Sequence, residues 1–318
     1  MKKQPLIVVV GPTASGKTKL SIELAKEFNG EIISADSMQI YKGMSVATAK
    51  PTTEEMQGIK HYLIDFLEPE TEFSVADYVT LARKSIEEIT AKGKIPIIVG
   101  GTGLYISSLV DNVKFDDTRS NTKIRDELYA IAKDKGNHFL WNELLKIDPV
   151  TAEKVHENNL SRVVRAIEVF RETGIPISQH KINSRAEESP YEPVMIGLTF
   201  KDRDKLYQRI EKRVDIMAEQ GMVDEAREIY ENHKLSTAHQ AIGYKELIPY
   251  FENKATLEEC LDKIKLETRH YAKRQLTWFR RDERIKWYEI DEFVNSKKIL
   301  ENVKNYVAKT KIMCYNID

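Results

Sequence analysis

The first hundred residues alternate short apolar runs with segments whose apolar residues recur at helical spacing. Three runs, 6–10, 31–34 and 95–99, are rich in valine and isoleucine, as buried strands are. Residues 20–28 and 75–90 show the three- and four-residue spacing of amphipathic helices. Strands that alternate with helices predict an α/β fold, with a parallel sheet flanked by helices.

Residues 114–190 break this alternation. The segment is polar, has no convincing strand, and repeats its apolar residues at steps of three and four, for example within 163–170. Gly174 follows that stretch where a helix would end. We therefore expect an inserted helical subdomain at 114–190, between two parts of one α/β core, 1–113 and 191–318.

The core pattern returns after the insertion. Residues 194–200 form an apolar run typical of a buried strand, and 206–217 carry an apolar stripe at helical spacing. A long helix is predicted over 257–281, and a short strand and a final helix within 288–318. Ligands bind at the carboxyl ends of the strands in such sheets, so the residues after each strand are the candidates for function.

Composition places the chain among ordinary globular proteins. Of its 318 residues, 41% are hydrophobic and 31% charged, and the formal net charge is -1. Cys260 and Cys314 lack the spacing of a metal or redox site, which argues against a disulfide framework or a zinc module. The run at 6–10 is too short for a secretion signal, and no run has membrane-spanning length. We expect a cytoplasmic protein with no membrane contact.

A phosphate loop follows the first strand, because the residues there match the pattern G-x-x-x-x-G-K-[ST]. In such loops Lys17 would reach the terminal phosphates and the Thr18 hydroxyl would be a Mg²⁺ ligand. The alternative is a glycine-rich turn without a ligand. The motif alone does not say which polyphosphate binds, or whether a P–O or a C–O bond breaks. The predicted loop consists of Gly11, Pro12, Thr13, Ala14, Ser15, Gly16, Lys17 and Thr18.

Asp36 follows the second strand, so its carboxylate is expected at the same edge of the sheet as the phosphate loop. Two roles suit it: contact with Mg²⁺ or water, or general base catalysis, which contributes roughly 10²–10⁴-fold. The alternative is an aspartate that caps a turn or a helix.

The third strand ends in glycines rather than in an acidic residue. Gly100, Gly101 and Gly103 carry no side chains, so we expect a substrate backbone or base to approach closely there. Thr102 is the one side chain of this stretch able to form hydrogen bonds. A plain tight turn explains the same pattern.

Basic residues form two kinds of pattern. Arg162 and Arg165, and likewise Arg209 and Arg213, are spaced to share a helix face, from which a pair could clamp phosphates. Surface ion pairs are the commoner use of a single arginine. Within 265–281, six of seventeen residues are lysine or arginine, a positive stripe typical of contact with a nucleic-acid backbone.

Several segments in order along the chain resemble the tRNA dimethylallyltransferases, also called tRNA isopentenyltransferases. The form is similar to the bacterial one, since no zinc-finger pattern follows the basic helix. His270 departs from the glutamine that bacterial relatives often have. The segments that carry the resemblance are 11–18, 36–44, 48–51, 100–105, 241–245 and 268–278.

The resemblance implies a P-loop NTPase-like parallel sheet flanked by helices. It also implies transfer of a dimethylallyl group from dimethylallyl pyrophosphate to N6 of the adenosine on the 3′ side of a tRNA anticodon, with release of pyrophosphate. The implied partners are the tRNA anticodon stem-loop, dimethylallyl pyrophosphate and Mg²⁺, and we expect a monomer.

The resemblance also assigns roles to residues. Residues 11–18 would hold the pyrophosphate, with Thr18 on Mg²⁺, Lys17 and Arg209 would neutralise its charge, and Asp36 would take the N6 proton. The inserted subdomain would bind tRNA. The residues implied to contact tRNA are Asp36, Ser37, Met38, Gln39, Thr102, Arg125, Ser161, Arg162, Arg165, Gly243, Tyr244, Lys245, Arg269, Lys273 and Arg274.

Three other functions remain open at this stage. A nucleoside or small-molecule kinase would use ATP on the same loop, although the missing acid and the basic helix count against it. A non-catalytic RNA-binding switch would use a nucleotide only to change shape. An enzyme that prenylates free AMP should lack both the inserted subdomain and the basic helix.

Overall fold

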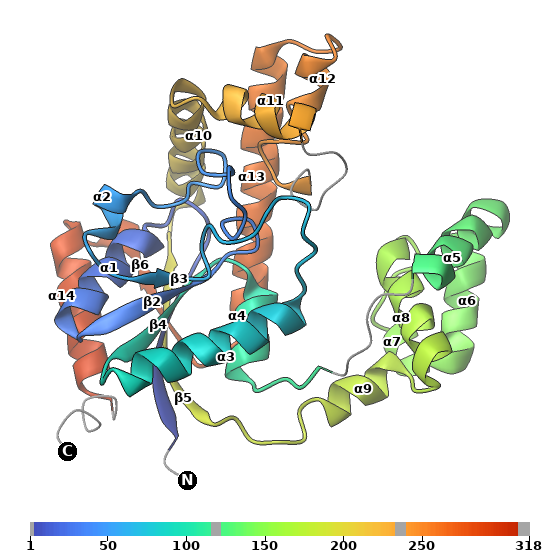
Figure 1. Cartoon of the computed structure of the whole chain (residues 1–318), viewed down its shortest axis with the longest axis horizontal. Coiled ribbons are helices and arrows are strands. Elements are labelled where there is room, and N and C mark those ends of the chain that lie inside the picture. The colour runs from blue at the N-terminus through green and yellow to red at the C-terminus, as the bar shows by residue number, and fades with distance from the viewer. Residues whose placement is uncertain (1–2, 116–121, 233–239, 311–318) are drawn as a thin grey trace. The chain divides into compact units, whose positions relative to one another are not determined.

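The computed structural model describes residues 3–115, 122–232 and 240–310 and contains one six-stranded parallel sheet (Figure 1). The strand order is β3-β2-β4-β1-β5-β6, and every pairing between neighbours is parallel. The predicted α/β fold is confirmed. The strands are β1 Gln4–Val10, β2 Gly30–Ala35, β3 His61–Tyr62, β4 Ile95–Gly100, β5 Tyr191–Thr199 and β6 Ile285–Glu289.

The helices agree with the apolar spacing where that spacing is long and regular. The basic helix begins after Thr256, whose side chain forms a capping box with Glu259, and Gly174 ends another helix with φ 70°. The helices are α1 Lys17–Glu27, α2 Thr53–Met56, α3 Val75–Ala91, α4 Gly103–Val110, α5 Thr122–Lys135, α6 Asn137–Ile147, α7 Pro149–Ala152, α8 Leu160–Thr173, α9 Ile177–Asn183, α10 Arg203–Glu219, α11 Met222–Asn232, α12 Ile248–Phe251, α13 Leu257–Phe279 and α14 Ser296–Ala308.

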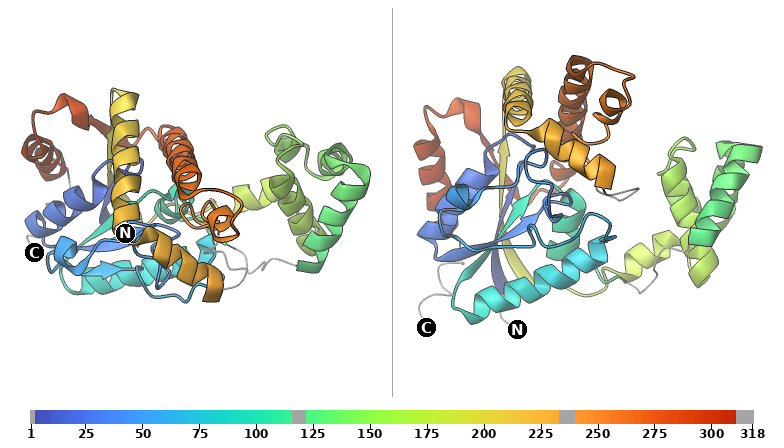
Figure 2. Two further views of the ribbon diagram at one scale, coloured as in Figure 1. Left: turned by 90° about the horizontal axis from the view of Figure 1, so that it is seen from above. Right: turned by 45° about the horizontal axis from the view of Figure 1, so that its top comes forward.

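The sheet is buried on both faces, which explains why its strands have continuous apolar runs. Along β1, Leu6, Val8 and Val10 pack in one cluster with α3 and α4. Ile7 and Val9 point to the other face, where α1 and α14 cover them. Figures 1 and 2 show these two helical layers on opposite sides of the sheet.

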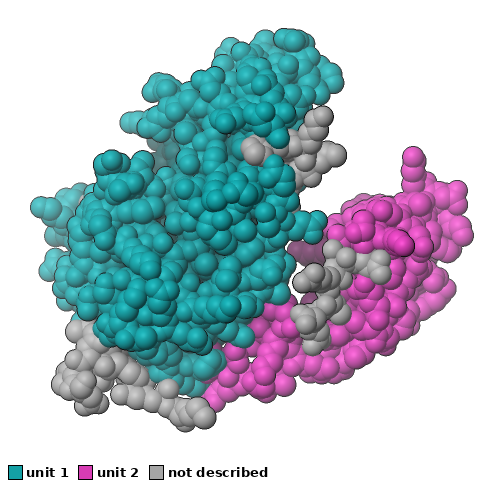
Figure 3. All heavy atoms as spheres, in the orientation of Figure 1, with its two compact units in different colours: residues 1–110, 190–318 teal, residues 111–189 magenta. Residues whose placement is uncertain are grey.

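The chain divides into two compact units, Met1–Val110 with Pro190–Asp318, and Asp111–Ser189 (Figure 3). The described residues of the second unit form α5 to α9 and no strand. Its separate core includes Leu128, Leu144 and Val163. A tRNA-binding role for this unit remains a prediction.

Two short elements differ from the sequence-based expectation. β3 has only two residues, too few for any periodic signal, and it was not predicted. β6 begins at Ile285, before the expected segment 288–318. Its start was not predicted because Lys286 interrupts the apolar pattern there. The end of that segment, 311–318 with Cys314, lies outside the described residues.

The glycines after β4 are needed for packing inside the protein, while Gly100 and Gly101 also line a cavity, so close approach of a substrate to them stays a prediction. A side chain on Gly100 would overlap the backbone of Ala35. One on Gly101 would overlap Gln275, and one on Gly103 would overlap Trp278. The glycines therefore allow α13 and the neighbouring strand to pack against this turn.

We expect Gly100→Ala to lower the free energy of unfolding by about 1–3 kcal/mol, because the added methyl group overlaps backbone that cannot move aside. Urea denaturation followed by circular dichroism measures the change. Lys84→Ala on exposed α3 surface is the control and should stay within about 0.5 kcal/mol of the parent protein. Equal midpoints for both variants would contradict the packing argument.

Candidate functional site

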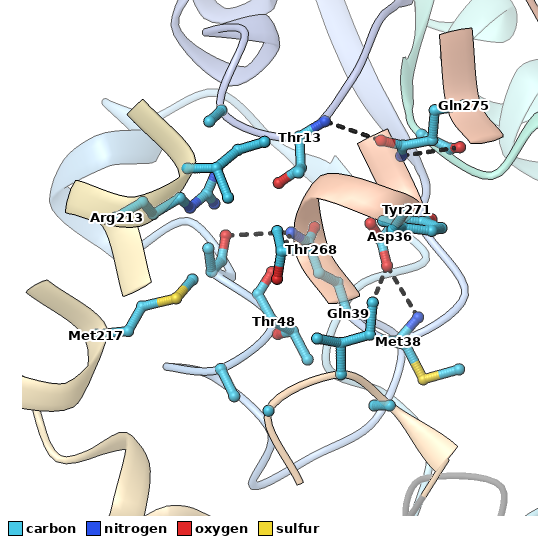
Figure 4. A pocket seen from close by; sticks show the side chains of 18 of the residues that line it. Thr13, Asp36, Met38, Gln39, Thr48, Arg213, Met217, Thr268, Tyr271 and Gln275 are labelled. Atoms are coloured by element: carbon cyan, nitrogen blue, oxygen red, sulfur yellow. Dashed lines mark hydrogen bonds between the residues drawn. The ribbon is translucent and has the colours of Figure 1, made fainter. Parts of the chain in front are cut away.

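A cavity of about 350 Å³ lies at the carboxyl edge of the sheet (Figure 4). The ends of parallel strands meet at one edge, so the loop after β1 and the turn after β2 both reach it. The remaining walls come from the end of β4 with Gly101, from α10, α13 and Met222 of α11, and from residues 47–49, 240–243 and 245. All of these elements belong to one compact unit.

The phosphate loop forms one end of the cavity, lined by residues 13–18. Gly16 has φ 84°, a conformation that glycine adopts without strain, and helix α1 begins at the next residue. The Lys17 ammonium donates to the carbonyl oxygen of Pro12 at 2.8 Å, which closes the loop. The Ser15 hydroxyl is buried and has no hydrogen-bond partner among the described residues. An unsatisfied donor inside this loop fits an anionic ligand.

Two helices hold the loop in this shape. From α10, Arg209 Nε donates to the carbonyl oxygen of Ala14 at 3.0 Å. From α13, the Gln275 amide oxygen accepts the Thr13 N–H at 2.9 Å. The other end of the same amide donates to the carbonyl oxygen of Gly101 at 3.1 Å. Gln275 thus joins the loop after β1 to the turn after β4.

Arg213, rather than Arg209, supplies a guanidinium to the cavity wall. Arg213 lines the cavity, whereas Arg209 stacks its guanidinium 5.6 Å from the centroid of the Phe200 ring and holds the loop. The resemblance implies charge neutralisation by Arg209; that role stays a prediction, and Arg213 lies one turn further along α10. Figure 4 shows Arg213 across the cavity from Gln275.

Two buried cations, Lys17 and Arg213, lie at the positive end of the cavity. Burial lowers the pKa of Lys17 to about 7, and the charge on Arg213 acts in the same direction, with Asp36 opposing both. Burial also lowers the pKa of Arg213, again opposed by Asp36. An anion bound here would relieve the repulsion between the two cations.

Asp36 lines the same cavity after β2. Its Oδ1 accepts the N–H groups of Met38 at 2.9 Å and Gln39 at 3.3 Å, the turn-capping geometry that the sequence left open. Among the described residues, no hydrogen bond is formed by Oδ2. The capping bonds fix the carboxylate, and the second oxygen is available as an acceptor.

Thr102 supports this turn rather than lining the cavity. Its Oγ1 accepts the Ser37 N–H at 3.1 Å and lies 3.4 Å from the Ser37 hydroxyl. In this structure Thr102 positions the residue after Asp36, and its contact with substrate stays a prediction.

The wall opposite the phosphate loop contains Met38, Gln39 and residues 47–49. The Gln39 amide donates to the carbonyl oxygens of Thr48 and Ala49, both at 3.1 Å. This side chain therefore ties the turn after β2 to the loop at 47–49.

Some basic residues of α13 form ion pairs with other helices of the protein, and others are exposed. Arg269 pairs with Glu211 at 2.5 Å and Lys265 with Asp215 at 2.7 Å, both across to α10. The predicted tRNA-contact residue Lys273 is exposed.

Three further predicted tRNA-contact residues of this unit line the cavity, and a fourth is buried. Arg274 and Lys245 are exposed and also line it, as does Gly243. Tyr244 is buried, and its hydroxyl donates to Glu225 at 2.6 Å. Its side chain is thus used inside the fold.

The predicted tRNA-contact residues of the second unit lie on α5 and α8. Arg125 and Arg165 both approach the carboxylate of Glu168 at 3.1 Å, and Glu168 is fully buried. The same helix carries Ser161 and Arg162, which are exposed.

The donors for a metal ion are few. Among the described residues, no cluster of three histidine, cysteine, aspartate or glutamate side chains could hold one. Thr18, which is exposed, and Asp36, which is half-buried, both line the cavity. Mg²⁺ usually keeps several waters and binds through one or two protein groups plus substrate phosphates, so this oxygen set fits Mg²⁺ carried by a pyrophosphate.

Sequence reasoning did not identify Gln275 and Tyr271 as site residues, and it named Arg213 only as one of a pair. Arg213 had been noted as half of a pair, and four-residue spacing places both members on one face without showing which one lines the cavity. Gln275 and Tyr271 lie within the basic stripe, and the charge pattern there does not show which uncharged polar side chains of the helix are buried. Burial and the nearby Asp36 raise the pKa of Tyr271, which therefore stays neutral.

A parallel sheet, a phosphate loop and a carboxylate in one cavity define a phosphate-loop α/β protein that binds an anionic substrate. Comparison with known proteins gives the family. The family model described as IPP transferase matches residues 39–282. A relative from Acetivibrio thermocellus named tRNA dimethylallyltransferase is 52% identical over 305 residues, 95% of this chain and 97% of the relative. The chain belongs to the IPP transferase family.

Solved structures agree with this assignment. A tRNA isopentenylpyrophosphate transferase from Bacillus halodurans is 44% identical, has a TM-score of 0.74, and is matched over 98% of both chains. A eukaryotic dimethylallyltransferase, described as acting on tRNA, is 30% identical with a TM-score of 0.80, covering 96% of this chain and 80% of that one. In the described residues, no helix has both the length and the apolar character to cross a bilayer.

The pKa of Lys17 generates a prediction about pH. Inorganic pyrophosphate should bind best when Lys17 is protonated, so its affinity should fall as pH rises through about 7, by up to about tenfold per pH unit. Isothermal titration calorimetry between about pH 6 and about pH 9 measures this effect. Lys17→Met gives the baseline for protonation of the ligand itself. Parallel pH profiles for the two proteins would contradict the assignment.

Proposed function

We propose that this protein transfers the dimethylallyl group of dimethylallyl pyrophosphate to N6 of the adenosine on the 3′ side of a tRNA anticodon. The observation that carries the proposal is one cavity with a cationic phosphate loop at one end and the Asp36 carboxylate in its wall. Relatives named tRNA dimethylallyltransferase, alike over 95% of this chain, support the same substrates.

The chemistry requires help at both reacting centres. The exocyclic amine of adenine is conjugated with the ring and is a poor nucleophile. In the transfer, N6 forms a bond to the allylic carbon, the bond from that carbon to the pyrophosphate oxygen breaks, and N6 loses one proton. Orientation of the two substrates and stabilisation of the leaving group supply most of the rate increase.

The leaving pyrophosphate would be held by the backbone N–H groups of Ala14 and of residues 16–18, and by the Lys17 ammonium. We assign neutralisation of its charge to Arg213 together with Lys17, because both line the cavity. Arg209 then acts through the loop that it holds at Ala14.

Asp36 would take the N6 proton through its free oxygen, while its other oxygen stays in the turn. Thr18 would contribute a hydroxyl ligand to Mg²⁺, which when bound neutralises charge on the pyrophosphate. Met38 and Gln39 would line the pocket for the adenine, which must leave its stack at a cost of roughly a few kcal/mol.

Contacts to the anticodon stem-loop are proposed on both units. Exposed Ser161 and Arg162, with half-exposed Arg125 and Arg165, would bind RNA phosphates from the second unit. Lys245, Lys273 and Arg274 would do so beside the cavity, where Ser37, Thr102, Gly243, Tyr244 and Arg269 contribute by shaping the surface. We further propose a monomer that works in the cytoplasm.

The direct test is incubation of the purified protein with unmodified tRNA and labelled dimethylallyl pyrophosphate, followed by nucleoside analysis. We expect N6-dimethylallyladenosine next to the anticodon and one pyrophosphate released per transfer. A kinase would instead release ADP from ATP, and a tRNA left unmodified would contradict the proposal.

Asp36→Asn should lower kcat by roughly 10²–10⁴-fold, because the amide keeps the turn but cannot accept the proton. Dissociation constants for pyrophosphate and for tRNA should change little. Rapid-quench measurements of single turnover separate the chemical step from binding. A variant that keeps most of its turnover would exclude Asp36 as the base.

Arg162→Ala should weaken tRNA binding at all sequences and reduce the salt dependence of log K by about 0.7–0.9. The reason is that one phosphate contact releases about one counterion. Fluorescence anisotropy at several salt concentrations measures the slope. Glu153→Ala, on exposed surface of the same unit, is the control, and an equal slope for both variants would remove Arg162 from the interface.

A further inference from the structure

One carboxylate outside the reacting groups makes an unusual number of contacts. Glu225 of α11 accepts the backbone N–H groups of Ser45 at 2.7 Å, Val46 at 2.8 Å and Ala47 at 3.0 Å. The hydroxyl of Tyr244 donates to the same carboxylate at 2.6 Å. Successive N–H groups that converge on an anion form a backbone nest, and an ionised acceptor makes each hydrogen bond stronger.

The nest holds a wall of the cavity. Ala47 is bound by Glu225, and the next two residues, Thr48 and Ala49, line the cavity with it. Their carbonyl oxygens accept hydrogen bonds from the side-chain amide of Gln39. The backbone N–H of Gln39 in turn donates to the Asp36 carboxylate at 3.3 Å. A chain of hydrogen bonds therefore runs from Glu225 through the 45–49 loop to the turn that carries the proposed base.

The packing beside the nest leaves this loop little freedom. A side chain placed on Gly243 would lie only 3.0 Å from the Cβ of Ala47, so the 240–245 segment closes against the loop. Burial, with Glu225 as the next cause, raises the pKa of Tyr244 and keeps its hydroxyl a donor.

The pyrophosphate end has its own supports. Arg209 holds Ala14, and Gln275 holds Thr13, both from helices other than α11. Loss of the nest should consequently disturb the wall near Gln39 and leave the phosphate loop in place.

We propose that Glu225 is a positioning residue for the transfer reaction, which fixes the 45–49 loop and, through Gln39, the adenine side of the cavity. The inference rests on the proposed function and adds to it a residue that touches neither substrate. Both carboxylate oxygens are required as acceptors, because a glutamine would turn an NH₂ group toward at least one of the three N–H donors.

The test compares Glu225→Gln with Glu228→Gln, a matched change at an exposed position of the same helix. We expect Glu225→Gln to lower kcat/KM with tRNA and dimethylallyl pyrophosphate by about 10–100-fold, the effect typical of groups that orient a site. The Kd for inorganic pyrophosphate should stay within about twofold of the parent protein, and Glu228→Gln should match the parent in both assays.

Tyr244→Phe provides a second variant that keeps the nest but removes one of its four donors. It should lower kcat/KM by roughly threefold to tenfold, again with unchanged pyrophosphate affinity. If Glu225→Gln fails to fold, this variant decides.

Two results would overturn the inference. One is a kcat/KM for the deciding variant within about twofold of the parent protein. The other is a parallel loss of pyrophosphate affinity and melting temperature, the mark of general structural damage. A parent protein that fails to prenylate tRNA would instead contradict the proposed function, so the two failures are distinguishable.

Discussion

The bracing of the phosphate loop by two helices is the constraint on which the rest of the site depends. Gln275 binds the loop at Thr13 and the glycine turn at Gly101, while Arg209 holds Ala14. The two helices are joined by ion pairs such as Arg269–Glu211. These bonds from outside the loop restrict its backbone, and a restricted loop loses less conformational entropy when it binds a ligand.

This bracing determines how the cavity divides. The cationic end consists of the loop, Lys17 and Arg213. Repulsion between the two cations makes binding of an anion favourable there. The other side is built from the Asp36 turn and the 45–49 loop, which Glu225 supports separately. Independent supports allow a leaving pyrophosphate to be held firmly while the adenine side is shaped for a base.

The sequence predicted the fold well because its signals are long and periodic. The runs that became β1 and β4 are apolar throughout, as expected for strands buried on both faces, and the phosphate loop follows β1 as its motif requires. The two-residue strand β3 carried no such signal. Long-range partners were equally invisible: no pattern in the sequence links Gln275 to Thr13, or Glu225 to Ser45.

The glycines after β4 show why local reasoning reached its limit. The absence of side chains at Gly101 and Gly103 indicates a close approach, but only the structure identifies the approaching group as α13. Likewise, helical spacing placed Arg209 and Arg213 on one face, and only the tertiary fold separated the residue that holds the loop from the residue that lines the cavity.

The most direct test of the account is a structure of the protein with an anticodon stem-loop RNA and an unreactive thio analogue of dimethylallyl pyrophosphate. The account predicts the pyrophosphate on the loop at 13–18 and the unstacked adenine with N6 within hydrogen-bond distance, about 2.6–3.2 Å, of the Asp36 carboxylate. An adenine that stays stacked in the RNA, or that lies away from Asp36 with the pyrophosphate outside the loop, would contradict it.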